Sequence, residues 1–361
     1  MHYLDLSAAA DLREDPKNDK PTEIQGYLQL SSELNHKKKE KDEIMCYLSA
    51  MFPLPKPTTT SIVAPPRLKT ASLNSSAPVD PVWAVVIGTN KYAHAQWLDG
   101  AVKDACAVRE FLLHFLHVPE DHISLLLDRN ATREAIITTL HDHLLNNPMI
   151  KRGDAIIIYF AGHGARYVND RGGSYEAIVP ADRGKMLSAD SLDIVEDICE
   201  HKLHSYLNQL RDAKGYNITL ILDCCYSGGC SRGGPAATRA VRSAAPLHHP
   251  PPRLDQRTAQ CERKRCVRCL TGDNDWERDM TSHVLLAACQ EDELAMDSVR
   301  GGAFTRALLR RLRLICSTTC LTTMTYVRLM AKLVSLGERQ HPMVVGEHQD
   351  SVLFRVCDRS R

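Results

Sequence analysis

The sequence of 361 residues lacks several features that would point directly to a class of partner. Lysine and arginine number 45 and aspartate and glutamate 44, so the formal net charge of +1 gives no argument for a nucleic-acid or membrane partner. No apolar run approaches the roughly 18 residues that a membrane helix needs, and the longest strong run is 155–161. The first twenty residues are acidic and have no apolar stretch, which argues against a secretory signal.

Three common catalytic signatures are also missing. The chain contains no G-x-x-x-x-G-K-[ST] phosphate loop, no H-E-x-x-H zinc helix and no G-x-S-x-G nucleophile elbow. It does contain 13 cysteines, an odd number in a chain far longer than the small secreted scaffolds that rely on disulfides. Reduced thiols and a cytoplasmic location are therefore expected, and targeting to an organelle stays open.

Composition divides the chain into three zones. Residues 1–52 are polar, with a charge run over 36–43 that predicts a solvated, partly helical arm. Residues 53–81 hold seven prolines among serines and threonines, and proline fixes φ and lacks an N–H donor, so an extended linker is predicted. From 82 onward, apolar runs alternate with amphipathic stretches. With 43% hydrophobic and 25% charged residues overall, zone 82–361 is predicted to be a globular domain.

Continuous apolar runs in this third zone predict strands covered on both faces, as in a parallel sheet. The runs lie at 82–88, 123–127, 155–161, 218–222 and 283–288, with a sixth candidate at 351–354. Between them, apolar residues at three- to four-residue steps predict helices at 102–116, 132–144, 203–210, 305–314 and 326–336. Thr132 is a plausible N-cap, and Gly215 ends the third helix. Together these elements predict a three-layer α/β fold with a mostly parallel, six-stranded sheet.

One interval interrupts the alternation of strands and helices. Residues 231–270 hold nine lysines or arginines, two acidic residues and five prolines. This composition predicts an exposed, disordered insertion between the fourth and fifth strands, assigned to 231–282.

Two chemically capable side chains follow predicted strands. His163 stands between Gly162 and Gly164 after the third run, and Cys225 comes shortly before Gly228 after the fourth run. Sites in such sheets form beyond the carboxyl ends of the strands, so adjacent strands would bring His163 and Cys225 together. A lone buried cysteine is usually an inert apolar side chain. A cysteine and a histidine that both follow neighbouring strands in this way favour a catalytic role instead.

A thiolate beside an imidazole can carry out covalent acyl transfer. Cys225 would attack a scissile carbonyl, while His163 would protonate the leaving amine and then activate water. The backbone N–H groups of Gly164 and Cys225 are candidates for the oxyanion hole, where the carbonyl oxygen gains charge.

These segments resemble the caspase-fold cysteine peptidases, and most closely the metacaspase-like proteins of fungi. The family's strand ending in Gly-His-Gly is matched at 162–164, and its Asp-x-Cys-His-Ser-Gly segment is matched at 223–228. The segments 175–182, 282–289 and 302–305 also resemble the family, so the similarity covers about 82–356. The animal-caspase signature Gln-Ala-Cys-x-Gly is absent, which argues against cleavage after aspartate.

The resemblance implies roles for particular residues. It places the nucleophile at Cys225 rather than Cys224, and the partner histidine at His163. It also implies an acidic pocket, formed by Asp104 and Asp223, for an arginine or lysine before the scissile bond. For Asp104 the alternative is an exposed residue on the first helix. Protein or peptide substrates are thus expected, with no nucleic-acid or membrane partner.

The family resemblance further implies self-cleavage within the loop that holds the basic insertion, after a lysine or arginine between 231 and 282. No cofactor is required by the chemistry, although calcium activation through Glu196 and Asp197 is a hypothesis. A zinc site at Cys261, Cys266 and Cys269, with His248 or His249 as fourth ligand, is the less favoured interpretation of those cysteines.

A second function remains open, namely a catalytically inactive caspase-fold module that assembles with other proteins. Three positions differ from the family pattern and favour this alternative: Tyr226 replaces a histidine, Ala161 a serine and Ala101 a cysteine. In that case residues 1–81 and the basic insertion would be contact segments.

Overall fold

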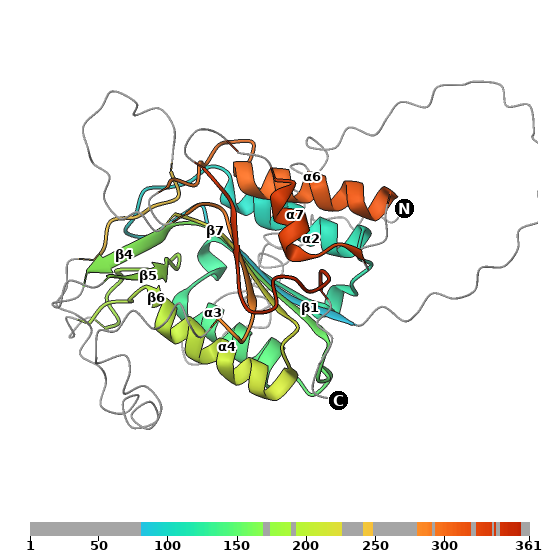
Figure 1. Ribbon diagram of the computed structural model, residues 1–361. Helices are drawn as coiled ribbons and strands as arrows, with labels where there is room; N and C mark the ends of the chain where they lie inside the picture. Colours follow the sequence, from blue (N-terminus) through green and yellow to red (C-terminus); the bar gives the residue numbers. More distant parts are fainter. Residues whose placement is uncertain are drawn as a thin grey trace, which may run out of the picture. The chain divides into compact units, whose positions relative to one another are not determined.

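The computed structural model in Figure 1 describes most of the third zone. The described residues are 81–168, 174–188, 193–225, 241–247, 280–290, 293–318, 323–333, 336 and 340–354. The predicted arm 1–52, the linker apart from residue 81, Tyr226 and the insertion's candidate zinc ligands lie outside the described residues.

A six-stranded sheet forms the centre of the domain, in the order β2-β1-β3-β7-β8-β9. Every neighbouring pair is parallel except β8 and β9, which are antiparallel. All residues of β1, β3 and β7 are buried, as the continuous apolar runs predict. The bounds are β1 Val82–Gly88, β2 Ile123–Leu127, β3 Ala155–Ala161, β7 Ile218–Asp223, β8 Val284–Ala287 and β9 Met343–Val345.

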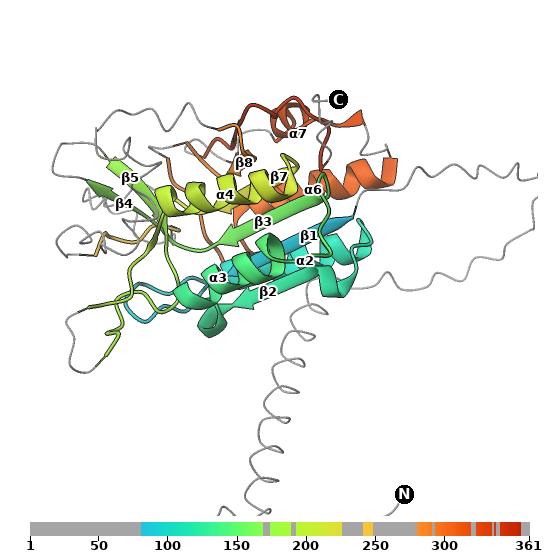
Figure 2. The same ribbon diagram turned by 90° about the horizontal axis from the view of Figure 1, so that it is seen from below.

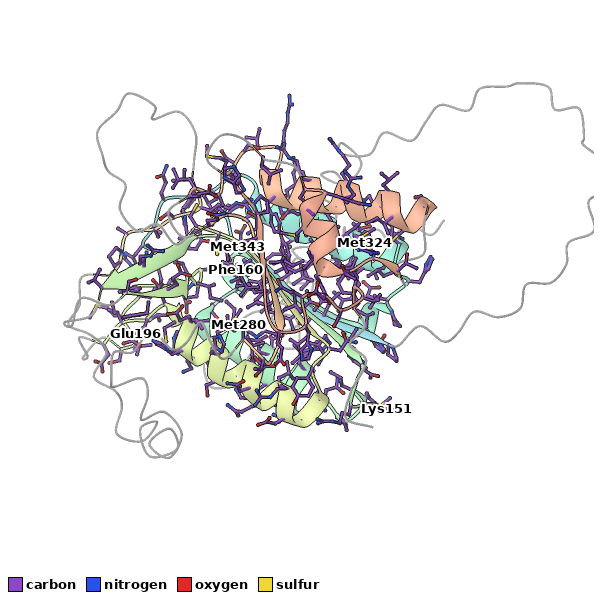
Figure 3. The ribbon with its side chains drawn as sticks, viewed as in Figure 1. Lys151, Phe160, Glu196, Met280, Met324 and Met343 are labelled. Atoms are coloured by element: carbon purple, nitrogen blue, oxygen red, sulfur yellow. The ribbon has the colours of Figure 1, made fainter. Side chains whose placement is uncertain are left out.

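Helices cover both faces of this sheet, which confirms the three-layer prediction (Figure 2). The helices α2 (Ala101–His114), α6 (Ala303–Thr318) and α7 (Tyr326–Ala331) pack on one face. The other face is covered by α3 (Arg133–Thr139), a π-helical stretch (Leu140–Leu145) and α4 (Glu200–Lys214). Successive side chains of a strand point to opposite faces, so the sheet separates two apolar clusters. Their side chains fill the space between the layers in Figure 3.

Local signals set the ends of several helices. The Thr132 hydroxyl accepts a hydrogen bond from the N–H of Ala135 at 3.1 Å, which confirms the predicted N-cap of α3. Gly215 ends α4 with φ of 95°, a region that favours glycine. Short 3₁₀ turns at Glu120–His122 and Asp128–Asn130 flank β2. Among the helices of the described residues, none is long and apolar enough to cross a membrane.

A small antiparallel sheet, β4-β5-β6, follows directly after β3. Its strands are β4 Gly164–Val168, β5 Ser174–Ile178 and β6 Ile198–Cys199. In Figure 2 the arrow of β3 points toward β4 and β5, so the small sheet lies at the carboxyl end of the central strands. The apolar runs did not predict these strands, because they are only partly buried or very short.

The sixth central strand is Met343–Val345, not the predicted 351–354. Residues 351–354 contain a turn and one isolated bridge between Val352 and Thr325. The apolar residues of that stretch are used differently, since Leu353 and Phe354 are buried against the cluster that contains α7. A three-residue edge strand is too short to show a clear apolar run.

Candidate active site

The structure brings the two predicted chemical groups to the same edge of the sheet. His163 follows β3 and Cys225 follows β7, and these parallel neighbours end in register with Ala161 opposite Asp223. His163 is 1% exposed and Cys225 is 0% exposed. The site is therefore closed to solvent.

Two backbone amides converge on one carbonyl oxygen at this edge. The N–H groups of Gly164 and Cys225, the pair predicted for an oxyanion hole, each donate to the carbonyl of Arg242 at 3.0 Å. Arg242 belongs to the insertion that composition predicts to be exposed. Within residues 241–247 the prediction is wrong for Arg242 and Ala244, which are buried, while Ala245 is exposed; the segment also pairs with Gly164 and Met296.

The Arg242 side chain enters a pocket of three carboxylates. Nη2 lies 2.5 Å from Asp104 Oδ2, and Nη1 lies 2.9 Å from Asp223 Oδ2. Oδ1 of Asp297 accepts from Nε at 3.1 Å and from Nη2 at 2.9 Å. Nη1 also donates to the carbonyl of Asp223 at 3.2 Å. Arg242 thus makes four hydrogen bonds in the pocket, and its Nη1 also forms an ion-pair contact with Asp223 Oδ2.

Other contacts fix the pocket carboxylates in place. Asp104 is buried, not exposed on its helix, and its Oδ2 accepts the N–H of Gly302 at 2.7 Å. Asp223 Oδ2 accepts the hydroxyl of Thr305 at 2.6 Å. A Cβ on Gly302 would lie 2.6 Å from that same oxygen, so the close approach requires glycine here.

Sequence reasoning missed Asp297, the third carboxylate. Its Oδ2 accepts the backbone N–H groups of Asp99 at 2.7 Å and Gly100 at 3.2 Å, while Oδ1 faces Arg242. A search of the loop after the fifth predicted strand for acidic residues would have included it, since sites form beyond strand ends.

Electrostatics keep Arg242 charged inside this pocket. Burial alone would lower the pKa of the guanidinium, but Asp223, Asp104 and Asp297 raise it well above its ordinary value. Burial also raises the pKa of the Asp104 carboxyl, an effect that the charge of Arg242 opposes. A buried charge is stable when it is paired and hydrogen-bonded, as it is here.

The imidazole of His163 is oriented by a loop that follows β1. Nε2 lies 2.7 Å from the carbonyl oxygen of Gln96, and the backbone N–H of His163 donates to the hydroxyl of Tyr92 at 2.8 Å. A carbonyl only accepts, so Nε2 carries the proton and Nδ1 has a free lone pair. Nδ1 is buried and has no hydrogen-bond partner among the described residues. Burial lowers the pKa of His163 to about 4, and the charge of Arg183 adds to the effect.

The two adjacent cysteines have different surroundings. Cys225 packs in the cluster with α2 and α6, whereas Cys224 packs in the cluster with α3 and α4. The Cys225 sulfur accepts the N–H of Ala295 at 2.7 Å and lies 3.2 Å from the Ala295 carbonyl. The Cys289 thiol is a further neighbour, and hydrogen bonding to Cys225 together with burial raises its pKa.

The Glu196–Asp197 pair does not fit a calcium site. Asp197 Oδ2 accepts from Arg183 at 2.8 Å and from the Tyr167 hydroxyl at 2.6 Å. Calcium takes six to eight oxygen ligands, and a guanidinium this close repels a cation. Within the described part of the chain, no group of three or more histidine, cysteine, aspartate or glutamate residues is arranged to hold a metal.

The lowered pKa of His163 predicts a pH-dependent stability. The unfolded chain binds a proton at this histidine near pH 6.5 and the folded chain near pH 4. We therefore expect the free energy of unfolding to fall by about 3 kcal/mol through this group as the pH drops across that interval. Urea unfolding from pH 7.5 to 4 measures it. The variant His163→Gln should show a smaller loss, and an equal loss in both proteins would contradict the burial argument.

Comparison with known proteins places this arrangement in a family. A model of the caspase domain matches residues 81–354. The chain is 27% identical over 154 residues to Metacaspase-9 and 30% identical over 156 residues to Metacaspase-6, both of Arabidopsis thaliana. Each match covers 40% of this chain. The matched region is 43% of Metacaspase-9 and 38% of Metacaspase-6, so this chain spans about two fifths of each relative.

A solved structure shares the fold. A crystal structure of a protein from Geobacter sulfurreducens superposes with a TM-score of 0.51 at 18% identity, covering 76% of this chain and 99% of that one. At this identity the likeness concerns the fold alone. The family match covers most of the chain, including both strand ends that carry His163 and Cys225. The chain therefore belongs to the caspase-domain peptidase family.

Proposed function

We propose that this protein is a cysteine endopeptidase that cleaves after arginine or lysine and cuts its own Arg242–Ser243 bond. One observation carries the proposal. The Arg242 carbonyl accepts both candidate oxyanion-hole amides while its guanidinium fills the acidic pocket. A substrate poised for acyl transfer needs both its side chain and its reacting carbonyl held in this way.

In the proposed acylation, the Cys225 thiol gives its proton to Nδ1 of His163 and its sulfur attacks the Arg242 carbonyl carbon. Negative charge on the oxygen develops between the N–H groups of Gly164 and Cys225. The bond to the Ser243 nitrogen then breaks, and His163 returns the proton to that nitrogen. Water, deprotonated by His163, hydrolyses the thioester, which leaves a carboxylate on Arg242 and restores the thiol.

The environment of the dyad supports this assignment of roles. The neutral imidazole can accept a proton at Nδ1, which has no hydrogen-bond partner within the part of the chain that the structure describes, because Nε2 is committed to Gln96. The Cys225 thiol contacts the Ala295 backbone, so it must leave that contact to react. Cys224 lies in the opposite apolar cluster and is not proposed as a nucleophile.

The pocket favours arginine over lysine within the proposed specificity. The Arg242 guanidinium makes four hydrogen bonds, including one from Nε to Asp297, and a further ion-pair contact with Asp223. A lysine has three donors and would leave buried acceptors unpaired. Each unpaired buried acceptor costs about 1–3 kcal/mol, which corresponds to roughly 10- to 100-fold in rate.

We also propose that substrates are proteins with a basic residue before the bond, that nucleic acid and membranes are not partners, and that the protein is cytoplasmic. Six cysteines of the described residues are free thiols, which supports a reducing compartment. The proposed chemistry uses a thiol, an imidazole and backbone amides, and it needs no cofactor.

The alternative function is an inactive module for assembly. The observation that favours it is the closed site, because Cys225 and His163 are both buried and the pocket is filled by the chain itself. In that case Arg242 would be a permanent structural ion pair rather than a substrate. The two experiments below separate the two functions.

The first experiment measures hydrolysis of matched fluorogenic peptides ending in arginine, lysine or aspartate. We expect kcat/KM to be about 10- to 100-fold higher for arginine than for lysine, with no turnover of the aspartate peptide. Cys225→Ser and His163→Gln should abolish turnover, and the matched control Cys224→Ser should retain it. Equal signals from wild type and Cys225→Ser would favour the assembly module.

The second experiment follows the integrity of the purified full chain by electrophoresis. Wild type should convert into two fragments, 1–242 and 243–361, while Cys225→Ala and Arg242→Gln remain intact. Arg239→Gln, which changes a neighbouring basic residue, should be cut like wild type. Cleavage of the Arg242→Gln chain at the wild-type rate would show that another bond is used.

A further inference from the structure

Three side chains outside the dyad hold the segment that follows the Arg242–Ser243 bond. Arg183 donates from Nη1 and Nη2 to the carbonyl of Ala245, at 3.1 Å each. The hydroxyl of Tyr167 accepts the N–H of Leu247 at 3.3 Å. Asp197 joins the two, since its Oδ2 accepts from Arg183 and from Tyr167. We call Arg183, Asp197 and Tyr167 the leaving-side clamp.

The side chains of the clamp are held in place by burial, an ion pair and ring stacking. Arg183 is 2% exposed, and the Arg183–Asp197 ion pair measures 2.8 Å with both side chains buried. Burial raises the pKa of Asp197, and the charge of Arg183 opposes that rise. The ring of Tyr167 stacks on Tyr175 of the neighbouring strand, with centroids 5.1 Å apart. Burying an ion pair costs desolvation free energy, so a buried pair beside the candidate active site favours a functional role for it.

The contacts identify the ligand as polypeptide main chain. The clamp binds the carbonyl of the third residue and the N–H of the fifth residue after the bond, so all three of these hydrogen bonds involve main-chain atoms of the segment. Between the bond and the clamp, the N–H of Ala244 donates to the carbonyl of Gly164 at 2.8 Å, and Ser243 pairs with Gly164. An extended chain of any sequence with an N–H at the fifth position offers these groups.

We propose that the leaving-side clamp is a substrate-binding subsite that recognises the backbone of the third and fifth residues beyond the cleaved bond. This proposal rests on the proposed peptidase activity and on Arg242–Ser243 as its internal substrate. The enzyme then prefers bonds inside an extended polypeptide over bonds near a chain end. After self-cleavage, the same contacts hold residues 243–247 until a substrate displaces them.

The test compares two peptides with the self-processed full chain. One is acetyl-Val-Arg-Ser-Ala-amide and the other is acetyl-Val-Arg-Ser-Ala-Ala-Pro-Leu-amide, which copies residues 241–247 and reaches the clamp. We expect kcat/KM in wild type to be about tenfold higher for the longer peptide, because charge-assisted bonds to Arg183 are gained. In Arg183→Gln this ratio should fall to nearly one. Because Arg183 also lowers the pKa of His163, the ratio within one variant cancels any effect on the dyad.

A second measurement avoids the loss of a buried charge. N-methylation of the leucine in the longer peptide removes the N–H that Tyr167 accepts. We expect this change to lower kcat/KM several-fold in wild type and to have no further effect in Tyr167→Phe, as in a double-mutant cycle. Equal wild-type rates for both peptide lengths, or a methylation effect that persists in Tyr167→Phe, would overturn the clamp while leaving the peptidase intact. Failure of wild type to hydrolyse either peptide would overturn the proposed function and the clamp with it.

Discussion

The arrangement of the site depends on one buried guanidinium surrounded by three carboxylates. Arg242 is fully buried, and a lone charge in that position would be strongly unfavourable. Asp104, Asp223 and Asp297 offset the cost, and they come from three segments far apart in the sequence. Because the side chain is fixed at its end, the backbone carbonyl of Arg242 is delivered to the amides of Gly164 and Cys225. One ion-pair network thus sets the register of the peptide across the site.

The parallel sheet makes this network possible. The carboxyl ends of β3 and β7 meet at one edge, so residues 62 positions apart share a site without any direct sequence link. Gly302 lets the start of α6 approach Asp223 closely, and Thr305 of that helix binds the same carboxylate. Cys225 has no exposed surface, and the Arg242 carbonyl lies on its backbone N–H. In the proposed self-cleavage, the segment that fills the pocket would also be the first substrate.

Much of the central sheet could be predicted from the sequence because its strands are buried on both faces. The runs that form β1, β3 and β7 are continuous and apolar, and their ends point to His163 and Cys225. The small sheet could not be predicted in the same way, since β4 and β5 are only partly buried and β6 has two residues. The edge strand β9 was not predicted because its three residues are too few to form a clear apolar run.

Arg242 could not be singled out from the sequence, because residues 231–270 hold eight other basic residues and composition predicts exposure for all of them. Its burial depends on hydrogen-bond acceptors in elements that are distant in the sequence. The local composition around Arg242 therefore does not predict these contacts. The same reason applies to Asp297 and to the Arg183–Asp197 pair. A carboxylate in a loop is usually a solvated surface residue, and only the fold shows which cation it meets.

The most direct test of the central claim is the amino-terminal sequence of the smaller fragment formed by the wild-type chain. Engagement of the Arg242 carbonyl by the two amides predicts a new terminus that begins Ser243-Ala244-Ala245. A terminus elsewhere in the insertion, or a chain that stays whole while it hydrolyses arginine peptides, would contradict the claim that this bond is held for cleavage.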